Sequence, residues 1–130
     1  MSELSLYLGQ VFGLFMIVVG IVVMAREEQV MPVIGAFLKD RSESMMLGMV
    51  EFLAGLFFVL AYQEWGTVYE GILSVIAWLV LIEGLFYLLA TDSWMKWLAK
   101  TFNVKAWYLG GGLAAVVLGV YLAGIGFGLF

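Results

Sequence analysis

The sequence LSLYLGQVFGLFMIVVGIVVMA, residues 4–25, runs for 22 positions without a charged side chain. A helix needs about 20 apolar residues to cross the roughly 30 Å hydrocarbon core of a bilayer. Near the other end of the chain, residues 107–127 form a second uncharged stretch, WYLGGGLAAVVLGVYLAGIGF. These two stretches predict transmembrane helices at Leu4–Ala25 and Trp107–Phe127.

Two further apolar stretches lie between them. The first, Ser44–Tyr62, is interrupted by Glu51, and the second, Val68–Ala90, is interrupted by Glu70 and Glu83. The apolar runs are continuous rather than alternating, which excludes the strand pattern of a membrane β-barrel. We therefore expect an all-α integral membrane protein, folded as a four-transmembrane-helix bundle.

The composition excludes several classes of function. The 130 residues are 65% hydrophobic and only 12% charged, about half the charged fraction of a typical soluble domain. There is no His and no Cys, which excludes Ser-His and Cys-His nucleophiles, imidazole or thiolate metal sites and disulfides. We expect no enzymatic activity, no cofactor, no metal and no nucleic-acid partner. The leading Met1-Ser2-Glu3 lacks the basic residues of a signal peptide, so the first span is expected to stay uncleaved.

The lysines and arginines predict the orientation. All six fall in the first and third connections between the predicted spans, and positively charged loops stay on the cytoplasmic side of a membrane. We therefore expect loops 26–43 and 91–106 to be cytoplasmic, with both termini outside and the protein in the cell (inner) membrane. The six cations are Arg26, Lys39, Arg41, Lys96, Lys100 and Lys105.

The two halves of the chain match when one is shifted by 64 positions. The shift aligns the first span with the third and the second span with the fourth. Both copies keep the same orientation, which implies a pseudo-two-fold axis along the membrane normal. We expect two parallel helix–interfacial helix–helix repeats, residues 1–65 and 66–130. The matched glycines are Gly20 with Gly84, Gly48 with Gly112, and Gly55 with Gly119.

The third connection contains an amphipathic segment, Ser93–Phe102. Its tryptophans share one helical face and its lysines lie off that face, as in helices that lie in the membrane interface. The segment is either a short connector that closes off the bundle or a site for anionic lipid or a partner protein. The expected interfacial anchors are Trp94, Trp97, Lys96 and Lys100, together with Arg41 and Lys105.

Local signals predict where the loop helices begin. Asp92 or Ser93 can cap the helix that ends at Phe102. The first connection offers a weaker helix over Met31–Lys39, in which Pro32 fits a first-turn position.

Three motifs of the second half match a known pattern: WLVLIEGLF at residues 78–86, Trp94 and Lys96 in the amphipathic loop, and GGGL at residues 110–113. In these the chain resembles the YjeT-like family of short, two-span bacterial inner-membrane proteins of unknown function. The match departs from the family where Thr91-Asp92-Ser93 replaces a Pro, and where residues 106–109 lack basic side chains. The resemblance implies a fused duplicate of a two-span unit and implies no particular activity.

Small residues predict where the spans pack, because lipid tails are as apolar as Leu and leave close van der Waals contact as a main attraction between helices. In the last span, small residues recur at every fourth position. The expected packing positions are Gly9, Gly13, Gly48, Gly55, Gly111, Ala115, Gly119 and Ala123.

Glu51 and Glu83 are the ionisable groups deepest in the predicted spans. Each lies about seven residues from the cytoplasmic end of its span, a depth of roughly 10 Å. Tyr87, one turn after Glu83, can hydrogen-bond its carboxyl, and Arg41 or Lys105 can reach in from the loops. We expect a protonatable pair that serves as interhelical hydrogen-bonding groups, as proton or cation coupling groups, or as a contact to another subunit.

These features leave two functions. The first is a structural or accessory subunit that binds partner membrane proteins or lipids through its helix faces. The second is an oligomeric proton-coupled small-solute transporter or channel that uses Glu51 and Glu83. Beyond the lipid bilayer, the expected partners are another copy of the chain or a different membrane protein.

Overall fold

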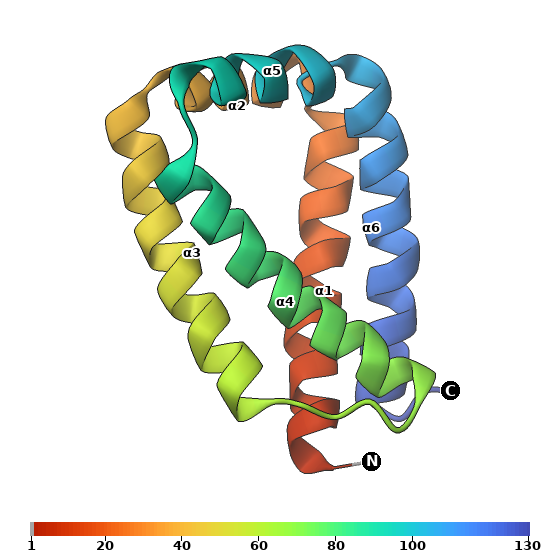
Figure 1. Ribbon diagram of the computed structural model, residues 1–130. Coiled ribbons are helices and arrows are strands. Elements are labelled where there is room, and N and C mark those ends of the chain that lie inside the picture. Colours follow the sequence, from red (N-terminus) through yellow and green to blue (C-terminus); the bar gives the residue numbers. More distant parts are fainter. Residues whose placement is uncertain (1) are drawn as a thin grey trace. The chain divides into compact units, whose positions relative to one another are not determined.

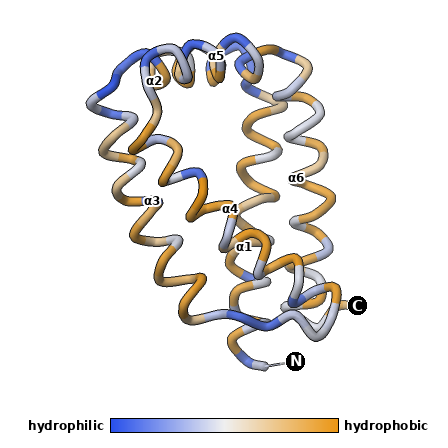
Figure 2. Tube along the Cα trace, viewed as in Figure 1, coloured by the Kyte–Doolittle hydropathy of each residue, from blue (hydrophilic) through white to orange (hydrophobic). Residues whose placement is uncertain are grey.

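The computed structural model describes residues 2–130, which form six α-helices and no strand (Figure 1). Four of these helices are long and apolar enough to cross a membrane, which confirms the all-α fold with four candidate membrane spans. Figure 2 shows hydrophobic residues along the long helices and hydrophilic ones gathered in the two short helices and the loops. The long helices are α1 (Glu3–Ala25), α3 (Arg41–Ala61), α4 (Val68–Leu89) and α6 (Lys105–Gly126); the short ones are α2 (Glu27–Lys39) and α5 (Asp92–Phe102).

The long helices pair as α1 with α6 and as α3 with α4. Each pair belongs to a separate compact unit. One unit is formed by the segment that ends at Ile34 together with Phe102–Phe130, and the other by Gly35–Thr101. The boundaries of these units differ from the repeat boundaries expected from the sequence, because the first span pairs with the last rather than with its neighbour along the chain.

In the α1–α6 pair, glycines let the two backbones touch. A Cβ built on Gly20 would lie 2.6 Å from the Gly112 carbonyl oxygen, and one on Gly119 would lie 2.7 Å from the Gly13 carbonyl oxygen. The Gln10 amide nitrogen donates a hydrogen bond of 2.7 Å to the carbonyl oxygen at the far end of α6, that of Gly126. Gln10 is near the start of α1 and Gly126 ends α6, whereas Gly20 is near the end of α1 and meets Gly112 near the start of α6, so the pair is antiparallel.

The α3–α4 pair is built in the same way. A Cβ on Gly48 would lie 3.1 Å from the Gly84 carbonyl oxygen, and one on Gly55 would lie 2.5 Å from the Leu81 Cα atom. A Cβ on Gly84 would clash with the backbone of Phe52. Each of these positions therefore accepts glycine alone without a shift of the partner helix.

Within the chain, the fourfold stripe expected in the last span makes no contact at Gly111. Gly111 is exposed and a Cβ there would meet no atom within 4 Å, whereas Gly112 is buried against α1. A step of four residues rotates by about 40° around a helix, while a step of seven drifts by only about 20° in the opposite sense. The contact face therefore follows the sevenfold series Gly112, Gly119 and Gly126, all of them buried.

The remaining packing positions differ in how closely they are enclosed. Gly13 contacts Ala123, where a Cβ would lie 2.5 Å from the Ala123 nitrogen. Gly9 is buried in α1, and Ala115 is half-buried in α6.

Two predicted helix starts are also wrong. In α2 the Arg26 carbonyl oxygen accepts hydrogen bonds from the Gln29 and Val30 amides. The helix therefore begins at Glu27 rather than at Met31, and Pro32 lies in its interior. In α5 the capping group is the Thr91 hydroxyl, which accepts from the Trp94 amide at 3.3 Å. Asp92 instead occupies the first turn, where a negative charge suits the helix dipole.

The glycine contacts generate a stability prediction. Gly119→Leu should lower the melting temperature of the purified protein in detergent, because forced overpacking of a helix contact costs about 1–3 kcal/mol. Gly111→Leu on the same helix is the matched control, since its side chain would extend into open space. Circular dichroism during heating measures both, and equal melting temperatures would contradict the assigned contact face.

Candidate functional site

The close approach of α3 and α4 brings the two intramembrane glutamates into one region. A Cβ on Gly84 would lie 2.8 Å from the carbonyl carbon of Glu51, so the residue after Glu83 packs directly against the backbone of Glu51. The two carboxyls are near enough to interact electrostatically. The expected pair is therefore one cluster, contributed by facing turns of neighbouring helices.

The two glutamates have different surroundings. The Glu51 side chain is half-buried, and its Oε2 atom is buried with no hydrogen-bond partner among the described residues. The Glu83 side chain is exposed and accepts a hydrogen bond from the Tyr87 hydroxyl one turn along α4. Removal of a carboxyl from water disfavours its charged form, and the Glu51 oxygen lacks a donor that would offset this cost.

Tyr87 is the buried member of the cluster, with 9% of its surface exposed. Its ring meets the Phe37 ring edge-on, with 5.8 Å between the ring centroids. It also belongs to a small apolar core with Leu38, Ala90 and Met95. Tyr87 thus connects the carboxyl cluster to the end of the helix pair from which α2 and α5 extend.

Arg41 lies outside the carboxyl cluster. Its two terminal guanidinium nitrogens donate to the Tyr87 and Leu88 carbonyl oxygens, at 2.7 and 3.1 Å. Those carbonyls are in the last turn of α4, where a helix leaves main-chain acceptors free and where a positive charge is favourable. The expectation that Arg41 reaches the carboxyls is therefore replaced by a C-terminal cap on α4.

Lys105 begins α6 in the other unit. It lines a cavity of about 480 Å³ with Arg26, Glu27 and Glu28, and it therefore lies beside the acidic start of α2.

The tryptophans of α5 lie on its exposed face. Trp94 and Trp97 are 51% and 57% exposed, and Lys96 and Lys100 are exposed as well. The Trp94 ring stacks on Phe86 at 5.9 Å. The residue that anchors α5 to the protein is Met95, only 4% exposed. An alternation of two exposed aromatics with a buried Met suits a helix that faces the membrane interface on one side and the protein on the other.

Sequence reasoning missed Met95 and the packing roles of Gly20, Gly84 and Gly112. The 64-residue shift carried a signal for the glycines, because it matches Gly20 with Gly84 and Gly48 with Gly112. All four lie at close backbone contacts.

The cluster offers two carboxyls and a phenol and no other chemistry. The described residues contain no group of three or more acidic, His or Cys side chains that could hold a metal ion. Such a cluster can exchange protons, accept hydrogen bonds or attract a cation. Searches of protein-family models, curated proteins and solved structures found no match to this chain.

The Tyr87–Glu83 hydrogen bond can be measured with a double-mutant cycle of Tyr87→Phe, which removes the donor, and Glu83→Ala, which removes the acceptor. We expect a coupling free energy of about 0.6 kcal/mol, and at most roughly 1.7 kcal/mol, as for other hydrogen bonds between membrane side chains. Unfolding in mixed detergent micelles provides the four free energies. Pairing Glu83→Ala with Tyr7→Phe, at an exposed tyrosine of α1, should give no coupling, and strictly additive effects of Tyr87→Phe and Glu83→Ala would exclude the bond.

Proposed function

We propose that the protein is a structural or accessory subunit of the cell (inner) membrane that binds partner membrane proteins or lipids and catalyses no reaction. The observation that carries this proposal is the exposed aromatic face of α5. Trp94 and Trp97 are more than half exposed and line a cavity of about 320 Å³ with Phe86. Large aromatics with a shallow apolar cavity form the kind of surface that anchors a protein partner or a lipid.

The distribution of polar groups supports the same proposal. Gln10 bonds the main chain of Gly126, and the Ser74 hydroxyl bonds the Glu64 carbonyl oxygen at 2.6 Å. Arg41 caps α4. These polar side chains bind main-chain carbonyl oxygens and so stabilise the helices and their ends. Such a use of polar groups suits a structural subunit.

A duplicated two-span unit accounts for the helix pairing, and we propose that origin for the chain. The contact of Gly20 with Gly112 corresponds, after the 64-residue shift, to that of Gly84 with Gly48. Likewise, Gly119 packs against Ile17, and its counterpart Gly55 packs against Leu81, the counterpart of Ile17. In both pairs the first span of one repeat contacts the second span of the other. A dimer of two-span proteins, such as the resemblance to the YjeT-like family implies, would produce the same two interfaces.

The accessory role is tested by mild-detergent purification from native membranes. We expect a membrane protein to copurify with the tagged wild type, and the Trp94→Ala/Trp97→Ala variant to recover about tenfold less of it, as for the loss of an aromatic hot spot. The matched control is Trp78→Ala, which removes a 45% exposed tryptophan from the middle of α4. Equal recovery with all three proteins would contradict the assigned surface.

The second candidate is the oligomeric proton-coupled transporter or channel, and the unpaired Glu51 Oε2 atom favours it. Purified protein in liposomes with an internal pH dye distinguishes the two functions. Proton flux above that of empty liposomes, abolished by Glu51→Gln together with Glu83→Gln, would overturn the accessory proposal. On the accessory proposal, wild-type and empty liposomes give the same flux.

We also propose that the ends carrying the cations face the cytoplasm and that both termini lie outside. The positions of Lys39, Arg41 and Lys96 around one cavity support this orientation, because cytoplasmic surfaces collect Lys and Arg. An Asp40→Cys variant should react with a membrane-impermeant thiol reagent in inverted vesicles and not in intact spheroplasts. Labelling in spheroplasts would show that residue 40 faces the outside and would contradict the proposed orientation. The cysteine-free wild type is the blank.

A further inference from the structure

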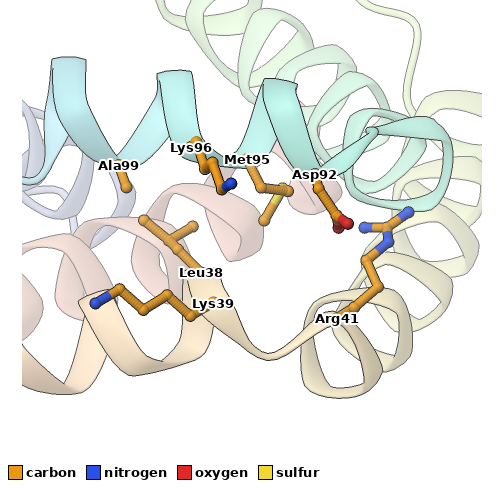
Figure 3. A pocket seen from close by; sticks show the side chains of 7 residues that line it. All are labelled: Leu38, Lys39, Arg41, Asp92, Met95, Lys96 and Ala99. Carbon is orange, nitrogen blue, oxygen red and sulfur yellow. The ribbon is translucent and has the colours of Figure 1, made fainter.

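A cavity of about 520 Å³ opens where α2 ends, α3 begins and α5 passes (Figure 3). All of its walls belong to the unit Gly35–Thr101. The charged side chains at the cavity are three cations and one anion, so its lining is net positive. The lining residues are Leu38, Lys39, Arg41, Asp92, Met95, Lys96 and Ala99.

The two lysines are the available charges. Arg41 is already engaged by the Tyr87 and Leu88 carbonyl oxygens, and Figure 3 shows the Asp92 carboxylate directed toward its guanidinium. Lys39 and Lys96 come from different helices, are exposed, and form no hydrogen bond or ion pair within residues 2–130. Figure 3 shows the two ammonium groups on opposite walls and directed apart, and both flexible side chains can turn toward one anion between them without breaking an existing contact.

The base of the cavity is apolar. Leu38 and Met95 are 7% and 4% exposed and pack with Tyr87 and Ala90, and Ala99 adds a methyl group beside them. An inorganic anion would gain nothing from this surface. A ligand that has both a phosphate and carbon atoms next to it can use the lysines and the apolar base together.

The cavity also lies beside a helix suited to the membrane interface. Met95 and Lys96 line it from one side of α5, while Trp94 and Trp97 lie exposed on the other side of the same helix. Tryptophans of this kind settle at the level of lipid headgroups. A helix placed in this way would hold Lys96 at the depth of the lipid phosphates.

We propose that this cavity binds the phosphate of an anionic phospholipid, with Lys39 and Lys96 on the phosphate and Leu38, Met95 and Ala99 against the glycerol carbons. The inference rests on the proposed function, since it names a lipid as one ligand of the accessory protein. A free phosphate shares the charge chemistry and is separated from the lipid by the experiment.

The test uses the full-length protein in detergent and native mass spectrometry, with phosphatidylglycerol, phosphatidylcholine and inorganic phosphate as probes. We expect one phosphatidylglycerol to be retained in preference to phosphatidylcholine. Lys39→Gln with Lys96→Gln should weaken that binding about thirtyfold, because each lysine near an anionic headgroup contributes on the order of fivefold. Lys39→Arg with Lys96→Arg should restore it.

The matched control is Lys100→Gln with Lys105→Gln, which removes the same charge from residues outside the cavity and should leave phosphatidylglycerol binding unchanged. Equal losses in the two double variants would overturn the proposal, because they would reduce binding to general surface charge. Binding of inorganic phosphate without phosphatidylglycerol would overturn the lipid assignment. Circular dichroism of each variant excludes unfolding as the cause of a loss. The lipid-binding measurement uses the purified protein alone. Its outcome therefore does not depend on whether a partner protein copurifies from native membranes.

Discussion

Direct contact between helix backbones at glycine is the constraint on which the rest of this structure depends. In each helix pair, two glycines face one another where the spans cross, Gly20 with Gly112 and Gly48 with Gly84. Leu and Phe side chains gain little by leaving lipid for another helix, so the favourable energy comes from close main-chain packing. A single methyl group at these four positions would separate the helices.

The same contact explains where the carboxyls lie. Because Gly84 packs against the backbone at Glu51, the side chain of the preceding Glu83 is brought into range of its counterpart on α3. Tyr87 follows one turn later and supplies the hydrogen bond to Glu83. The polar cluster inside the membrane is therefore a consequence of helix packing, whichever use the protein makes of it.

The parts of the fold that depend on composition and period could be predicted from the sequence. Four apolar runs of membrane-spanning length led to the four long helices with shifts of a few residues at their ends. The glutamates and Tyr87 were also predictable as neighbours, since their spacing along the spans places them at one level.

The features that the sequence does not predict depend on single hydrogen bonds or on helix rotation. The starts of α2 and α5 are determined by the Arg26 carbonyl and the Thr91 hydroxyl, and Gly111 differs from Gly112 by one step of rotation. The pairing of the first span with the last, and the cap formed by Arg41, depend on tertiary contacts that no local pattern contains.

The cap on α4 has a mechanical consequence. A transmembrane helix usually frays where it leaves the bilayer, because its last carbonyl groups exchange between water and headgroups. Here two of those carbonyls are bound to the first residue of α3, so the end of one helix is tied to the beginning of its neighbour. Sliding of α4 along its own axis would break two charge-assisted hydrogen bonds at once. The helices α3 and α4 are therefore expected to tilt or rotate together as one rigid pair, because a displacement of either helix alone would break the cap.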